Sequence, residues 1–361
     1  MRNIYAVLLW TGMLVVLVSF VVVIASDKFR NGEEEVIEDE KMSVGHSAVE
    51  NDDEAEEVLR GEMMNEGGPS YHPEVSLPAM MEEEYNGSDL ELVRVVRETD
   101  TYTEHFITYT SGELTISGIL NIPTGEVPES GFPVLFLNHG YIDPSVYTNG
   151  RGLRREQDFL AREGFAVLHS DYRNHAASDD DPDSETMLRL GYVEDVINAV
   201  MAVRRSDVPE LSKDRFGMLG HSMGGGIAQS IMVVRPELVD AYVLYAPVSS
   251  DARDSFRRWT SRRSETAEQI AELYGLPEDA PAFWDDVSPR MFFDRVTSPV
   301  MIFHGTADAS CDIAWSRETR DLLASAGAEV ELVEYPGEAH EFGPRHTDFM
   351  RRTAEFFREE L

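Results

Sequence analysis

Ser222 is the residue whose surroundings point most directly to chemistry. It lies in Gly220-His221-Ser222-Met223-Gly224, between the apolar stretch 215–219, typical of a strand, and the stretch 225–234, typical of a buried helix. A Gly-x-Ser-x-Gly segment in that position puts the serine on a sharp, strained turn, because the glycines leave room where side chains would clash. By itself the pentapeptide also fits a plain glycine-rich connection between a strand and a helix.

Two further residues complete the set that a serine nucleophile requires. The serine needs a base that takes its proton, a carboxylate that orients the base, and hydrogen-bond donors for the oxyanion. Asp308 follows the apolar stretch 300–304, and His340 follows the stretch 330–334, so each lies just beyond a strand-like segment. The order serine, acid, histidine is the one that accompanies such a serine turn. We therefore predict that Ser222 is the nucleophile, Asp308 the orienting acid and His340 the base.

Other side chains compete for these roles. Asp312 lies further from the end of its strand than the preferred acid does, and His346 reads as the start of the last helix. His221 lies inside the serine turn, where we expect it to point away from Ser222 and to pack. The preferred acid and base are also compatible, each taken singly, with ordinary turn residues.

The oxyanion donors are predicted to be backbone N–H groups. The segment Leu137-Asn138-His139-Gly140-Tyr141 follows the first core strand, and its glycine lets the backbone approach a substrate. We predict that the N–H of Tyr141 and that of Met223, the residue after the nucleophile, form the oxyanion hole. His139 is expected to support this loop rather than to react. Losing one donor of this kind typically costs about 3 kcal/mol in the transition state.

Composition excludes several other functions. The chain carries 67 acidic against 31 basic residues, a net charge of -36, and a field of that sign repels nucleic acid. No His-Glu-x-x-His segment, cysteine-rich spacing or phosphate-cradling glycine loop occurs, so we predict neither a metal nor a cofactor. An acidic, lysine-poor surface fits life in high salt as well as a biased genome composition, and the sequence leaves both open.

The chain divides into three parts. Residues 4–26 contain no charge and as a helix would span roughly 35 Å, enough for a hydrocarbon core of about 30 Å. We expect an uncleaved membrane anchor that leaves the catalytic domain outside the cytoplasm; residues 23–25 resemble a cleavage site, so secretion after cleavage is the alternative. Residues 27–100 are expected to form an acidic, largely disordered tether, and residues 101–361 the catalytic domain. Within the tether, residues 75–81 could instead pack on the domain, and residues 90–96 could begin a strand.

Strand-like and helix-like stretches alternate from residue 104 onward, which predicts an α/β domain with a mostly parallel sheet covered on both faces. In such sheets, sites gather at the carboxyl ends of the strands. The predicted strands are 105–110, 114–122, 133–138, 165–170, 215–219, 241–245, 300–304 and 330–334, and the predicted helices are 154–163, 187–204, 225–234 and 346–358.

The stretch between the strands 241–245 and 300–304 is too long for one crossover. We predict a helical cap at about 249–296, inserted over the carboxyl edge of the sheet. The alternative is a surface excursion without a role in substrate binding. Its aromatic side chains could wall an apolar pocket, but filling the core of the cap is the favoured interpretation. They are Trp259, Tyr274, Phe283 and Trp284.

Residues 101–361 resemble an α/β-hydrolase, and more closely the catalytic domain of the prolyl oligopeptidase family and its dienelactone-hydrolase-like relatives. The resemblance covers about 240 residues and implies the α/β-hydrolase fold, with Ser222 as nucleophile, Asp308 as orienting acid and His340 as base. The residues that carry it are Asn138-His139-Gly140, Asp171-Tyr172-Arg173, Gly220-His221-Ser222-Met223-Gly224-Gly225, Ser288-Pro289, His304-Gly305-Thr306-Ala307-Asp308 and His340.

The chain departs from the large peptidases of that family, which carry a β-propeller before the hydrolase domain, where this sequence has the acidic tether. We expect a serine hydrolase that cleaves ester or amide bonds, peptide bonds included, through an acyl-enzyme, with a small ester or a short peptide as substrate. A carboxylesterase without peptidase activity is the alternative, followed by a non-catalytic binding protein with the same fold. The oligomeric state stays open.

Overall fold

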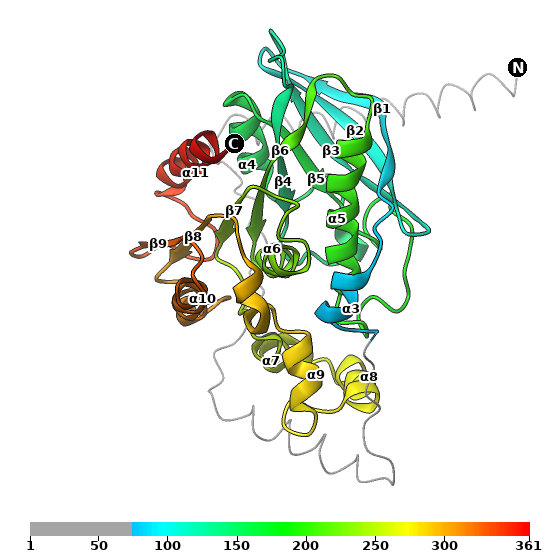
Figure 1. The fold of residues 1–361 in the computed structure, drawn as a ribbon, viewed down its shortest axis with the longest axis vertical. Helices are drawn as coiled ribbons and strands as arrows, with labels where there is room; N and C mark the ends of the chain where they lie inside the picture. Colours follow the sequence, from blue (N-terminus) through cyan, green and yellow to red (C-terminus); the bar gives the residue numbers. More distant parts are fainter. Residues whose placement is uncertain (1–73) are drawn as a thin grey trace, which may run out of the picture. The chain divides into compact units, whose positions relative to one another are not determined.

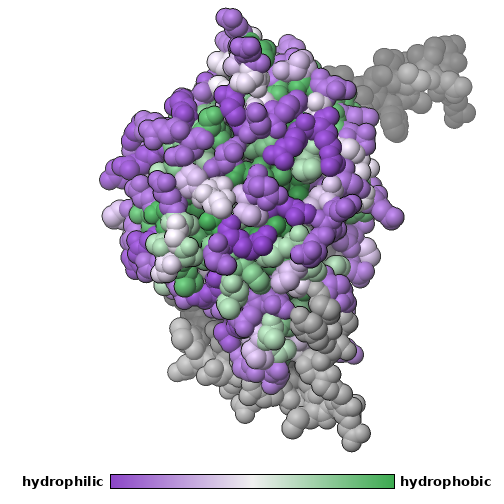
Figure 2. Space-filling view, in the orientation of Figure 1, coloured by the Kyte–Doolittle hydropathy of each residue, from purple (hydrophilic) through white to green (hydrophobic). Residues whose placement is uncertain are grey.

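The computed structural model describes residues 74–361. The predicted anchor at 4–26 and most of the predicted tether therefore lie outside the described residues. Between residues 74 and 361, none of the helices combines the length and the apolar composition needed to cross a membrane. Polar and charged side chains cover most of the face seen in Figure 2.

One sheet of nine strands forms the centre of the described domain (Figure 1). In chain order the strands are β1 (Ser88–Glu98), β2 (Tyr102–Ser111), β3 (Leu114–Pro123), β4 (Phe132–Asn138), β5 (Ala166–Ser170), β6 (Leu211–His221), β7 (Ala241–Tyr245), β8 (Val300–Gly305) and β9 (Val330–Tyr335). Their order across the sheet is β1-β2-β3-β5-β4-β6-β7-β8-β9, antiparallel from β1 to β5 and parallel from β5 to β9. The mostly parallel sheet and the predicted hairpin at 105–122 are confirmed.

Helices cover both faces of this sheet. They are α3 (Leu77–Glu82), α4 (Arg154–Arg162), α5 (Leu190–Arg205), α6 (Met223–Val234), α10 (Ile313–Ala326) and α11 (His346–Glu360), whereas α7 (Ala252–Ser255), α8 (Ser264–Tyr274) and α9 (Pro281–Asp286) belong to the segment between β7 and β8. The alternation of side chains along β4 shows how the two faces arise. Val134 and Phe136 join the apolar cluster shared with α5 and α6, whereas Leu135 and Leu137 join the cluster shared with α4 and α11.

The folded domain begins before its predicted boundary at residue 101. The predicted tether reaches residue 100, but α3 and β1 both lie within it. Leu77 and Met80 are buried in the core, and β1 pairs with β2 along its length, so this segment gains apolar burial and backbone hydrogen bonds that a solvated tether would lack.

Helix α5 starts later than the pattern predicts. The apolar spacing predicts a start at residue 187, whereas the helix begins at Leu190. The reason lies in the two preceding residues, because Leu188 and Arg189 have φ angles of 52° and 59°, in the left-handed region that a right-handed helix cannot contain.

The segment between β7 and β8 contains α7, α8 and α9, with a π-helical turn η2 (Phe256–Thr260) and a 3₁₀ helix η3 (Pro289–Arg295). It has an apolar core of its own, in which Tyr274, Phe283 and Trp284 are buried. These three aromatic side chains therefore fill the core of this segment. Trp259 is 38% exposed and packs edge-on against Trp315 instead.

Candidate active site

Ser222 occupies the junction between β6 and α6 with φ 55° and ψ −119°. A non-glycine residue in such a conformation costs about 1–3 kcal/mol and persists only where its surroundings hold it. Here the N–H of Ser222 donates to the carbonyl of Tyr245 at 3.1 Å. A Cβ added at Gly220 would lie 2.2 Å from the carbonyl oxygen of Gly224, and one at Gly224 would lie 2.0 Å from that of Asn138. Glycine is therefore required on both sides of the serine.

Asp308 and His340 meet although 32 residues separate them. Asp308 lies in the loop after β8 and His340 in the loop after the neighbouring strand β9, so both loops leave the same edge of the sheet. Nδ1 of His340 lies 2.7 Å from Oδ2 of Asp308. The Asp308 side chain is fully buried, and that of His340 is 22% exposed. A histidine whose Nδ1–H is held by a carboxylate presents Nε2 as the base.

The Asp308 carboxylate is stabilised in its ionised form. Oδ1 accepts hydrogen bonds from the N–H groups of Ser310 at 2.8 Å and Cys311 at 3.0 Å. Oδ2 lies 3.2 Å from Nε2 of His304. Burial alone would raise the pKa of Asp308, but the hydrogen bonds from His304 and His340 outweigh it and hold this pKa well below its usual range.

His304 is a functional neighbour that the sequence did not reveal. The sequence places it in the segment that leads to Asp308 and predicts no role for it. Its Nδ1 contacts Oγ of Ser316 at 2.7 Å, and its Nε2 lies 3.1 Å from the carbonyl oxygen of Cys311 and 3.2 Å from the Asp308 carboxylate. The only signal in the sequence is its position at the end of an apolar strand, four residues before Asp308.

Ser222 and His340 line one pocket of about 360 Å³. Oγ of Ser222 lies 3.9 Å from Sγ of Cys311, and within residues 74–361 no hydrogen bond joins it to His340. Catalytic hydrogen bonds of free hydrolases are often long and tighten only with substrate. Burial raises the pKa of the Cys311 thiol to about 12, so this sulfur stays protonated and does not compete as a nucleophile.

The two predicted oxyanion donors come from different elements than the predicted acid and base. Tyr141 follows β4 in a loop that lines the pocket, and Met223 is the first residue of α6. No acceptor within the described residues 74–361 takes the N–H of either one. A Cβ added at Gly140 would lie 3.1 Å from Cβ of Ser222, so this loop runs directly against the nucleophile.

Aromatic stacking supports the loop after β4 that carries Tyr141, the predicted oxyanion loop. The buried ring of His139 stacks on Tyr172 at 4.3 Å between centroids, and the Tyr172 hydroxyl donates to the carbonyl of His139 at 3.3 Å. Burial, together with the neighbouring His169, lowers the pKa of His139 to about 3, so the ring stays neutral. His139 thus contacts the loop as a scaffold.

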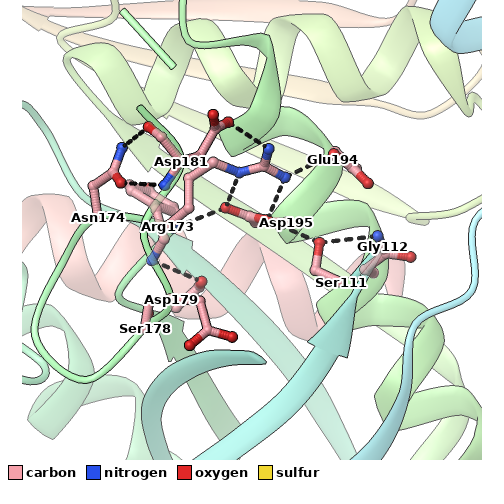
Figure 3. Close-up of polar contacts among 12 residues, drawn as sticks. Ser111, Gly112, Arg173, Asn174, Ser178, Asp179, Asp181, Glu194 and Asp195 are labelled. Atoms are coloured by element: carbon pink, nitrogen blue, oxygen red, sulfur yellow. Dashed lines mark hydrogen bonds and ion pairs between the residues drawn. The ribbon is translucent and has the colours of Figure 1, made fainter. Parts of the chain in front are cut away.

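Arg173 anchors the segment that carries Tyr172 (Figure 3). Its guanidinium binds Asp195 through two hydrogen bonds of 3.0 and 2.8 Å, and it also pairs with Asp181 at 3.0 Å and Glu194 at 2.7 Å. The Arg173 side chain is only 9% exposed, and Asp195 is fully buried. A buried arginine shared among three carboxylates fixes the backbone that follows β5, on which the oxyanion loop rests.

The competing residues have structural partners instead. Asp312 caps α10, accepting from the N–H of Ala314 at 2.8 Å. His346 begins α11 and contacts Oε1 of Glu156 at 2.9 Å. His221 packs against Tyr245, and its Nε2 lies 3.2 Å from the carbonyl oxygen of His340. Burial and the charge of His340 lower the pKa of His221 to about 3, which keeps it neutral.

The sequence of this chain is similar to those of known proteins. A model of the prolyl oligopeptidase family matches residues 151–361. The uncharacterized peptidase YtmA of Bacillus subtilis is 24% identical over 244 residues, which are 66% of this chain and 86% of that protein.

Solved structures share the fold. A putative dipeptidyl aminopeptidase IV from Bacteroides ovatus aligns with a TM-score of 0.59 and 18% identity over 72% of this chain, which spans 36% of that protein. An acetyl xylan esterase from Paenibacillus sp. R4 aligns with a TM-score of 0.57 and 19% identity, over 79% of this chain and 92% of that one. A putative peptidase and an esterase therefore both share its architecture.

Proposed function

Since this chain belongs to the prolyl oligopeptidase family of serine hydrolases, we propose that it cleaves ester or amide bonds through an acyl-enzyme formed on Ser222. The observation that carries this proposal is the hydrogen bond of 2.7 Å between His340 and the buried Asp308. The histidine lines the same pocket as the strained serine. A base, its orienting carboxylate and a nucleophile thus come from three loops at one edge of the sheet.

The reaction follows from the roles of these groups. Oγ of Ser222 attacks the carbonyl carbon while Nε2 of His340 takes the hydroxyl proton, and Asp308 stabilises the imidazolium that forms. The N–H groups of Tyr141 and Met223 donate to the oxyanion. The tetrahedral intermediate expels the alcohol or amine, which leaves with the proton from His340. Water then attacks the acyl-enzyme by the same steps and releases the acid.

Labelling with an active-site-directed fluorophosphonate tests the nucleophile. We expect the wild-type chain to be labelled on Ser222, as located by mass spectrometry, and Ser222→Ala to lose both the label and about 10⁴- to 10⁶-fold in kcat. Cys311→Ala is the matched control, because its thiol lies 3.9 Å from Oγ of Ser222, and this variant should still be labelled. A folded wild-type protein that resists labelling would overturn the proposal.

The substrate class is the second part of the proposal. We propose activity on both short esters and peptide-like amides, and the family membership supports the amide. The fold shared with an acetyl xylan esterase keeps the alternative, an esterase without peptidase activity. A comparison of p-nitrophenyl esters with aminoacyl and prolyl anilides separates the two. Turnover of esters alone favours the esterase, and a folded chain that turns over neither favours a non-catalytic protein.

We also propose that the catalytic domain works outside the cytoplasm, attached to a membrane by residues 4–26. The uncharged composition and the length of that stretch support the proposal. Membrane fractionation with sequencing of the mature N-terminus tests it. A mature chain that begins after residue 25 indicates secretion, and a chain found in the cytosol contradicts both.

A further inference from the structure

One arginine contacts the side chains of both predicted oxyanion residues. Cζ of Arg189 lies 4.8 Å from the centre of the Tyr141 ring, a cation–π distance. Nη1 of the same guanidinium lies 3.7 Å from Sδ of Met223. Tyr141, in the loop after β4, and Met223, the first residue of α6, lie 82 positions apart in the sequence, and Arg189 immediately precedes α5. Arg189 therefore contacts the side chains of both predicted oxyanion residues at once.

The guanidinium is itself held in a fixed orientation. Nε and Nη2 of Arg189 donate to the two carboxylate oxygens of Glu185 at 2.9 and 2.8 Å, a bidentate pair. This pair uses two of the three guanidinium nitrogens and leaves Nη1 directed at Met223. Arg263, which immediately precedes α8, donates to Glu185 at 2.8 Å. Through Glu185, the arginine is thus connected to the segment between β7 and β8.

The electrostatics of Glu185 agree with a permanent pair. Burial opposes the ionisation of this carboxyl, but the hydrogen bonds and charges of Arg189 and Arg263 outweigh it and lower its pKa. The carboxylate therefore stays charged at neutral pH and binds both arginines at once.

The backbone places Arg189 there at a cost. Leu188 and Arg189 are consecutive non-glycine residues with φ angles of 52° and 59°. Non-glycine residues rarely adopt this left-handed backbone conformation, and here two consecutive residues do. Their side chains contact different parts of the molecule. Leu188 packs against the apolar core of the segment between β7 and β8, whereas Arg189 turns toward Tyr141. Strain that is stored beside a reactive site and held by packing on both sides is typical of a position with a function.

We propose that Arg189 is a positioning residue for the oxyanion hole, holding Tyr141 and Met223 in register and coupling their geometry to the segment between β7 and β8. The inference rests on the proposed function, because it concerns the donors of the same reaction. Arg189 acts through the two residues whose N–H groups face the substrate. Since small displacements of such donors weaken transition-state binding more than substrate binding, its loss should lower kcat and leave KM nearly unchanged.

The test compares Arg189→Ala and Arg189→Lys with the wild type in the full chain. We expect Arg189→Ala to lower kcat for p-nitrophenyl acetate by about 10- to 100-fold with KM within about threefold. The inhibition constant of phenylboronic acid, which forms a tetrahedral adduct on the serine, should rise by the same factor. Arg189→Lys keeps the charge but not the fork, so it should fall between the two.

Arg162→Ala is the matched control. Arg162 forms the same kind of bidentate pair with the residue four positions earlier, Asp158, and its guanidinium lies 5.8 Å from the ring centre of Tyr102. It lies at the end of α4 away from the pocket, so its loss should leave kcat within about twofold of the wild type. Glu185→Gln weakens the anchor without touching either donor residue and should lower kcat by about 3- to 10-fold.

The outcomes separate this inference from the proposed function. A wild-type chain without Ser222-dependent turnover overturns both. If the wild type is active and the folded Arg189→Ala variant keeps its kcat and boronate affinity, this inference alone is overturned. An effect confined to KM also overturns it, because Arg189 would then be a substrate contact. If Arg189→Ala fails to fold by circular dichroism, Glu185→Gln decides, and unchanged kinetics there overturn the inference.

Discussion

The two sides of Ser222 are built in different ways. On the acid–base side, the Asp308 side chain is fully buried and His340 is 22% exposed. On the oxyanion side, Tyr141 is 50% exposed, and the ion pairs that hold its neighbour Arg189 reach the surface, with Glu185 33% exposed. Buried charge-assisted hydrogen bonds fix the pair of Asp308 and His340, whereas partly exposed ion pairs worth about 0–1 kcal/mol each hold Arg189 against Tyr141 and Met223. The proposed base is thus rigidly placed, and the side chains of the proposed oxyanion residues depend on contacts with more distant parts of the fold.

The two sides also respond to acid over different ranges. The pKa of Asp308 is lowered, so this carboxylate stabilises the fold above the pKa of an unfolded aspartate, about 3.9, and the stabilisation is lost as the pH falls below it. Beneath the oxyanion loop, His139 and His169 are buried and neutral with pKa values of about 3. The unfolded chain protonates these rings below about pH 6.5, so their contribution to stability is lost at higher pH than that of Asp308.

The largest expected effect lies on the acid–base side. Asp308→Asn should lower kcat by about 10⁴-fold, because the amide no longer stabilises the imidazolium or fixes its tautomer. Steady-state ester hydrolysis measures it. Asp312→Asn is the control, since asparagine caps a helix as well as aspartate does, and its kcat should match the wild type. A loss below tenfold in the first variant, or an equal loss in the second, would remove Asp308 from the acid role.

An intermediate effect lies on the oxyanion side. His169 is fully buried, and neither ring nitrogen has a hydrogen-bond partner on another of the residues 74–361. In the wild type, His169 takes up a proton on unfolding below about pH 6.5, which lowers the free energy of unfolding as the pH falls. His169→Phe removes this proton uptake. Between pH 6 and pH 4, the free energy of unfolding should therefore fall by about 1.4 kcal/mol per pH unit less in the variant than in the wild type. Urea denaturation across that range measures it. Parallel pH profiles for the variant and the wild type would contradict a neutral buried His169.

The smallest effect concerns a contact between the segment that links β7 and β8 and the loop after β8 that carries Asp308. Arg258 in η2 donates to the carbonyls of Ala309 and Ser310 at 2.6 and 2.8 Å. Because the N–H of Ser310 and other buried groups already fix Asp308, Arg258→Ala should lower Tm by only about 2–4 °C and leave kcat within about threefold. Thermal denaturation and ester kinetics measure both.

Arg257→Ala is the control for that variant, since the adjacent Arg257 pairs with Glu278, which lies in the same segment between β7 and β8. It should leave kcat unchanged. A larger kcat loss in Arg258→Ala than in Arg189→Ala would reverse the comparison, making the acid side the one that depends on the segment between β7 and β8.

Much of the sheet could be predicted from the sequence because its strands are short, continuous apolar runs. The strands around Ser222, Asp308 and His340 were predicted within a few residues of their observed bounds. Helix α10 was not predicted. The predicted boundary at residue 101 leaves out β1, because none of the residues of β1 is buried and the strand is recognisable mainly by its pairing with β2. The start of α5 was misjudged because nothing in the apolar spacing signals a left-handed Leu188.

The sequence by itself determined the chemistry that is available: a serine on a glycine-flanked turn, followed in order by an aspartate and a histidine beyond apolar strands. These features are local, and the parallel sheet brings the strand ends together without further information. Only the tertiary structure decided which side chains hold that chemistry in place. His304 beneath Asp308 and Arg189 across Tyr141 and Met223 act through contacts between distant segments, and packing rather than local pattern sets such contacts.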